Sequence, residues 1–113
     1  MTMVLGKSGR PGRSALVVGE LGELDGPLAG VVELPHRMLW LPAEDRRFDL
    51  ADDYDRARMY EIVLREAVHY AELRTFLNAR LLRDLWVDLF LPRGVRAAWE
   101  QRHPDLTGVR AGV

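Results

Sequence analysis

The sequence predicts an α+β fold: a short antiparallel β meander packed on about four helices, with a flexible N-terminal leader. Three observations lead to this class. Glycines recur through residues 1–26, short β-branched and apolar runs punctuated by proline follow, and apolar side chains recur at helical spacing over 51–103. With 113 residues, 48% hydrophobic and 29% charged, the chain has the size and composition of one globular domain.

The start of the chain, residues 1–26, is the predicted leader. Its glycines at positions 6, 9, 12, 19, 22 and 26 favour irregular structure, although the apolar run 15–18 is a candidate short strand. Three cations make its tip locally basic: Lys7, Arg10 and Arg13. The single α+β domain is expected to span 27–104, and a tail to follow over 105–113.

Three short segments are candidate strands, at 30–34, 37–41 and 46–50. Pro35 and Pro42 fall at their ends, because proline cannot donate a hydrogen bond to a sheet ladder. Two or three strands of this length are marginally stable alone, so we expect them to pack against the helices that follow.

The first helix is expected to begin after an aspartate N-cap, Asp52 or Asp53, with further acid in its first turn to complement the helix dipole. Apolar side chains within an arc of roughly 140° form the expected core face: Ala57, Tyr60, Val63, Leu64, Ala67 and Val68. The opposite side carries charges that can pair along the helix: Arg58, Glu61 and Arg65.

The next stretch is predicted to form two helices, 70–77 and 79–90, because the apolar stripes of its halves point roughly 140° apart on one wheel. A break near Asn78 removes this conflict, and asparagine is a suitable N-cap. Pro92 ends the second helix, since the residue before a proline is pushed out of helical space. A last helix is expected over 92–103, and its core-facing residues are Val95, Ala98 and Trp99.

The residue types exclude several chemistries. Cysteine is absent, which excludes a disulfide scaffold, a thiol nucleophile and a Cys-ligated zinc site. No pair among His36, His69 and His103 has helical ligand spacing, and no serine lies in a Gly-x-Ser-x-Gly turn. We therefore expect a protein that is not an enzyme and uses neither metal nor cofactor. A small enzyme or ligand-binding domain that uses His36 with the acidic residues between positions 44 and 55 is a further alternative.

Charge and hydropathy limit the partners. The chain has 15 arginines against one lysine, but its acids bring the net charge to −1, which argues against a polybasic nucleic-acid coat. No apolar run approaches the roughly 20 residues of a spanning helix, and the first residues do not resemble a signal peptide. We expect a cytoplasmic protein that does not bind membranes.

Two surfaces are candidates for binding a partner protein. Met59 and Ile62 lie off the core arc of the first helix beside Arg58 and Arg65, which predicts a modest apolar contact patch. Packing of both residues against the segment 30–48 is the alternative. An acidic lip with a charge of −4 over twelve residues could meet a basic partner, or it could be a polar loop entering a helix N-terminus. It comprises Glu44, Asp45, Asp49, Asp52, Asp53 and Asp55.

DNA binding is the alternative function. The two helices that meet near Asn78 resemble a helix-turn-helix pair, and their basic residues could act with the leader. The nucleic-acid candidates are Arg10, Arg13, Arg80 and Arg83. Asp84 and Asp88 stand on the same predicted face as Arg80 and Arg83, and their charge weakens any phosphate contact.

Several structural motifs carry a family resemblance over roughly residues 24–103: Asp25–Pro27, Gly30–Pro35, Tyr60–Glu66, Leu85–Trp86, Leu91–Pro92 and Val95–Glu100. They resemble small actinobacterial proteins that are similar to the antitoxin-like partners of AbiEii-type nucleotidyltransferase toxins. The resemblance implies a cognate toxin as partner and a regulatory role, and it assigns no residue a function. The leading hypothesis is therefore a non-enzymatic, antitoxin-like interaction protein.

Overall fold

Four α-helices and one two-stranded antiparallel sheet form the regular structure of residues 15–107, the part of the chain that the computed structural model describes. The predicted α+β class is confirmed. The strands are β1 (Val31–Glu33) and β2 (Arg47–Asp49), and the helices are α1 (Asp53–Glu66), α2 (Tyr70–Phe76), α3 (Ala79–Leu85) and α4 (Arg93–Arg102). The basic tip at Lys7, Arg10 and Arg13 lies outside the described residues.

The sheet is built from the first and third predicted segments. Val32 pairs with Phe48 and both side chains are buried, while the flanking pair Glu33 and Arg47 is exposed and joined by an ion pair at 3.1 Å. This alternation is that of a sheet with one face on the core. Gly30 precedes β1 with a φ of 94°, a conformation that favours glycine.

The strand predicted over 37–41 is wrong. Residues His36–Met38 form a 3-10 turn, in which the N–H groups of Met38 and Leu39 donate to carbonyls three residues back. A strand would place Met38 and Trp40 on one face. Met38 is buried instead and Trp40 is exposed, because the turn rotates them apart. Residues 15–18 are not a strand either.

The helix boundaries follow the capping residues. Asp52 caps α1 by accepting a hydrogen bond from the Asp55 N–H at 2.8 Å. Asn78 caps α3 by accepting from the Arg80 N–H at 2.9 Å, which confirms the break between α2 and α3. Helix α1 ends at Glu66, so Val68 leaves the predicted core arc and is exposed.

The second half of the predicted leader belongs to the core. Val18, Leu21 and Leu24 are buried, and the backbone N–H of Gly26 donates to the Leu77 carbonyl at 2.8 Å. Residues 15–26 are therefore packed structure, contrary to prediction. The tail was also predicted to start too early, because the 3-10 turn Pro104–Thr107 buries Leu106.

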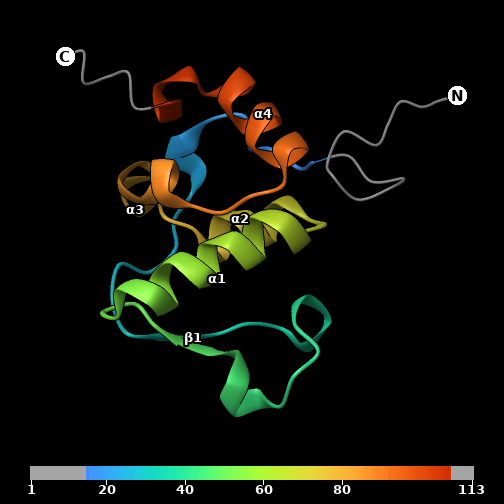
Figure 1. Ribbon diagram of the computed structural model, residues 1–113, viewed down its shortest axis with the longest axis vertical. Helices are drawn as coiled ribbons and strands as arrows, with labels where there is room; N and C mark the ends of the chain where they lie inside the picture. Colours follow the sequence, from blue (N-terminus) through green and yellow to red (C-terminus); the bar gives the residue numbers. More distant parts are fainter. Residues whose placement is uncertain (1–14, 108–113) are drawn as a thin grey trace, which may run out of the picture.

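Helix α1 lies at the centre of the fold (Figure 1). The two-stranded sheet and the loop between its strands lie on one side of it, and α2, α3 and α4 lie on the other. The buried residues form one apolar cluster that extends across both sides of α1. A Trp86–Trp99 pair, with ring centroids 6.3 Å apart, fills the part beneath α4.

Candidate protein-contact surface

The contact patch predicted on α1 is wrong, because α1 lies at the centre of the fold and the two apolar residues of the patch are buried. Met59 and Ile62 are 0% exposed, so neither side chain can meet a partner. Helix α1 contacts β2 and the turn His36–Met38, and Met59 and Ile62 belong to the single core cluster that also contains Phe48 and Met38. The alternative interpretation, packing against the segment 30–48, is the one that agrees with the structure. A helix between two layers buries two apolar stripes rather than one.

The charged residues near Met59 and Ile62 make contacts within the protein. Arg65 pairs with its neighbour Glu66 at 3.0 Å rather than with Glu61. Glu61 accepts a hydrogen bond from the backbone N–H of Phe90 at 2.8 Å. Arg58 is half-buried, and it has no ion pair with any described residue. The predicted ladder of pairs along α1 is therefore not formed.

The acidic lip is used mainly to shape the entry to α1. The Asp49 carboxylate accepts from a backbone N–H two residues on at 2.9 Å, and Asp55 accepts from the Asp49 N–H at 3.0 Å. Asp52 is the helix cap, and Asp53 pairs with Arg56. These contacts are those of a loop leading into a helix N-terminus. A further role for Asp49, Asp52 and Asp53 in binding a partner stays a prediction.

The helix pair around Asn78 carries little free positive charge. Arg83 pairs with Asp105 at 3.2 Å, and Asp84 and Asp88 line a cleft between α3 and the start of α1. Arg80 is exposed and has no ion pair with a described residue. The other nucleic-acid candidates, Arg10 and Arg13, lie outside the described residues, so DNA binding also stays a prediction.

The most exposed tryptophan of the described chain stands on the loop between the two strands. We call residues 35–42 the Trp40 loop. The Trp40 side chain is 77% exposed, and Leu41 beside it is also exposed. The His36 ring contacts the Trp40 ring edge-on, with centroids 4.7 Å apart. Scattered exposed leucines need no explanation, but a tryptophan exposed to this extent leaves a large apolar area in water.

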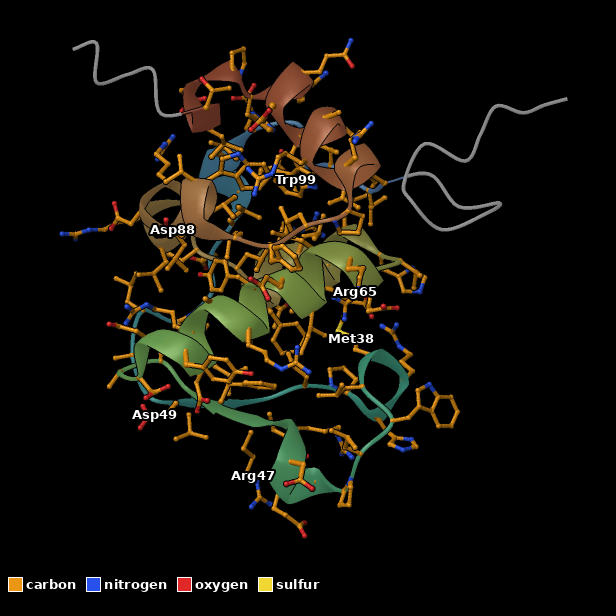
Figure 2. All side chains as sticks on the ribbon, in the orientation of Figure 1. Met38, Arg47, Asp49, Arg65, Asp88 and Trp99 are labelled. Atoms are coloured by element: carbon orange, nitrogen blue, oxygen red, sulfur yellow. The ribbon has the colours of Figure 1, made fainter. Side chains whose placement is uncertain are left out.

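Several contacts hold the Trp40 loop in place. Met38 is buried and points toward the C-terminal half of α1, where Arg65 lies (Figure 2). Arg46 donates from Nε to the Leu34 carbonyl at 2.9 Å and from Nη1 to the Leu41 carbonyl at 2.6 Å. Arg37 forms an ion pair with Glu72 of α2. Trp40 is thus presented on a loop fixed to the strands on one side and to α2 on the other.

The sequence around the Trp40 loop favours a loop over a strand. Pro35 and Pro42 bracket an uninterrupted apolar run, Met38–Leu41, in which no polar residue alternates. A half-buried strand would alternate, so the run indicates either a fully buried strand or an apolar surface loop. Two flanking prolines favour the loop, because neither can donate a hydrogen bond to a sheet ladder.

The buried side chains of Tyr60 and His103 both have hydrogen-bond partners within the fold. Tyr60 has its pKa raised to about 12 because burial disfavours the phenolate; its hydroxyl accepts a backbone hydrogen bond from Asn78 at 2.8 Å. His103 is buried, with Nε2 at 2.8 Å from the Val18 carbonyl. Within residues 15–107, no three His, Asp or Glu side chains gather as metal ligands would.

None of the helices in the described part of the chain has the length and apolar character needed to cross a membrane. A comparison with protein-family models, curated proteins and solved structures finds no match.

Proposed function

We propose that the chain is a non-enzymatic binding protein that docks a partner protein through the Trp40 loop. The observation that carries this proposal is the 77% exposure of Trp40 on a loop held by side-chain contacts at both ends. Tryptophan is among the residues most enriched at the centres of protein interfaces, where a few side chains supply most of the binding free energy.

The held conformation of the loop supports the same function. A mobile loop loses conformational entropy when a partner orders it, and this loss weakens the complex. Arg46 and Met38 already fix the loop in the free protein, so little ordering remains to be done on binding. His36 and Leu41 lie beside the Trp40 ring and enlarge its exposed surface into a small patch. An apolar centre with a polar rim is typical of protein interfaces.

The partner we propose is a nucleotidyltransferase toxin, and the chain would act as its antitoxin-like regulator. The resemblance of the stretches between residues 24 and 103 to antitoxin-like proteins supports this choice of partner. The Trp40 loop replaces the Met59 and Ile62 patch as the proposed contact surface, since those two residues are buried.

The experiment is co-expression of the chain with a nucleotidyltransferase toxin of the AbiEii type, followed by affinity measurement on the purified pair. We expect Trp40→Ala to weaken the complex by about 30-fold, the effect of losing a hot spot worth about 2 kcal/mol. The variant should also fail to restore growth of cells that express the toxin.

The matched control is Phe90→Ala, which removes an aromatic side chain of similar exposure, 88%, from the segment between α3 and α4. We expect this variant to bind and to protect as the unaltered chain does. Equal affinity of the Trp40→Ala protein would refute the loop as the contact surface. Failure of the unaltered chain to bind or to protect would refute the toxin as the partner.

A further inference from the structure

A cleft lined by two arginines forms a second surface of the described chain. The cleft has a volume of about 480 Å³ and lies where the first described residues meet α2 and the end of α4. The lining residues that bear on its chemistry are Val17, Gly19, Glu23, Tyr70, Arg74 and Arg102. Among the described lining residues, two guanidinium groups and one carboxylate share the cleft, and their charges sum to +1.

The arginines of the described chain are mostly paired with acids, and Arg102 is an exception. It has no carboxylate of a described residue within ion-pair distance, and its Nε donates to the Gly19 carbonyl at 3.3 Å. This bond orients the guanidinium at the cleft and leaves the two terminal nitrogens free to donate. Others without such a carboxylate, Arg58, Arg80 and Arg93, do not line this cleft.

The single carboxylate of the cleft does not neutralise both cations. Glu23 accepts a hydrogen bond from the Glu20 backbone N–H at 3.1 Å, as part of the turn Leu21–Glu23. Its other oxygen is 3.9 Å from Arg74, at the outer limit of an ion pair. With respect to the described residues, Arg74 has one weak ion pair and Arg102 has none; the two arginines stand on α2 and α4, which border the cleft.

We propose that this cleft binds a small anion: a phosphate or carboxylate group attached to a planar or apolar body. Guanidinium groups present planar forks of donors that match phosphate and carboxylate oxygens. The half-exposed Tyr70 ring and the Val17 side chain supply an apolar wall for the rest of the ligand. Gly19 has no side chain, so its backbone leaves room near the Arg102 guanidinium.

The test is a titration of the full chain with phenyl phosphate, benzoate and inorganic phosphate, followed by backbone amide chemical shifts. We expect saturable shifts that centre on Gly19 and Tyr70. The double variant Arg74→Gln, Arg102→Gln should weaken binding at least tenfold. Both side chains are exposed, so circular dichroism should show an unchanged fold. The matched control Arg80→Gln removes one unpaired arginine outside the cleft and should bind as before.

The probes separate the two ligand chemistries. Tighter binding of phenyl phosphate assigns the cleft to a phosphate ester, and tighter binding of benzoate assigns it to a carboxylate. Inorganic phosphate should bind more weakly than phenyl phosphate if the apolar wall contributes. Equal binding by the double variant, or shifts without saturation or away from Gly19 and Tyr70, would overturn the proposal. Because no toxin is used, the result is independent of the function proposed for the Trp40 loop.

Discussion

Tyr60 is buried in the middle of α1, and its side-chain hydroxyl has a hydrogen-bond partner. The hydroxyl accepts a hydrogen bond from the Asn78 N–H, which joins α1 to the break between α2 and α3. A buried phenol with such a partner is a structural group. Burial, the main cause of its raised pKa, disfavours the phenolate in the folded state.

This burial predicts a loss of stability at high pH. The folded pKa of about 12 lies above the value of 10.0 for a free tyrosine, so the folded state retains the proton longer. The contribution of Tyr60 is complete below pH 10 and is lost progressively as the pH rises toward 12, by roughly 2–3 kcal/mol in total. Urea denaturation at pH 8 and at pH 11 measures this loss in the free energy of unfolding.

Tyr60→Phe is the matched variant for that measurement. At pH 8 it should be less stable than the unaltered chain by about 1 kcal/mol, because the Asn78 N–H loses its partner. At pH 11 the difference should shrink, since phenylalanine does not ionise. Tyr54 and Tyr70 are exposed and present in both proteins, so the comparison isolates Tyr60. A difference that stays constant between the two pH values would contradict the assignment.

The α2–α3 break shows what can be read from local sequence and what cannot. Two apolar stripes at conflicting angles, together with the capping ability of Asn78, are local signals, and the break followed from them. The partner of the break is 52 residues away: the Asn78 side chain donates to the Gly26 carbonyl at 3.1 Å. The glycine content of residues 1–26 predicts a flexible leader. Composition does not reveal that Gly26 packs against a segment 52 residues away.

Gly26 is the position where this docking is most sensitive. A Cβ atom there would lie 2.7 Å from the Phe76 carbonyl carbon and 2.8 Å from the Leu77 oxygen, both backbone atoms that cannot move aside cheaply. We expect Gly26→Ala to destabilise the protein by about 1–3 kcal/mol and to lower Tm by roughly 5–20 °C.

Gly22→Ala is the control for that change. No atom lies within 4 Å of the Cβ it would introduce, so it should change Tm by no more than a few degrees. Thermal melts followed by circular dichroism compare the two variants directly. Similar Tm values for both would mean that the Gly26 segment does not pack closely on the α2–α3 junction.

At the scale of the whole molecule, the position of α1 explains the main error of the sequence interpretation. A single amphipathic arc placed Tyr60 and Val63 correctly in the core, and the same arc left Met59 and Ile62 outside. The wheel of one helix does not reveal that a sheet will cover its second face. That information lies in the pairing of β1 with β2, in the burial of Val32 and Phe48, and in the contact of β2 with α1.

The same arrangement determines how the chain should respond to truncation. Removing residues 1–26 deletes Val18, Leu21 and Leu24 from the core and takes the Val18 carbonyl from His103. Each apolar side chain contributes about 1.5–3 kcal/mol by burial, and their sum is comparable to the 5–15 kcal/mol that stabilises a typical domain. We expect the chain that begins at residue 27 to show no cooperative urea or thermal transition.

The chain that begins at residue 15 keeps every described core side chain and should unfold cooperatively. If both truncated chains melted with the same midpoint, the segment 15–26 would not be part of the folded core, and the leader predicted from its glycines would be the better description.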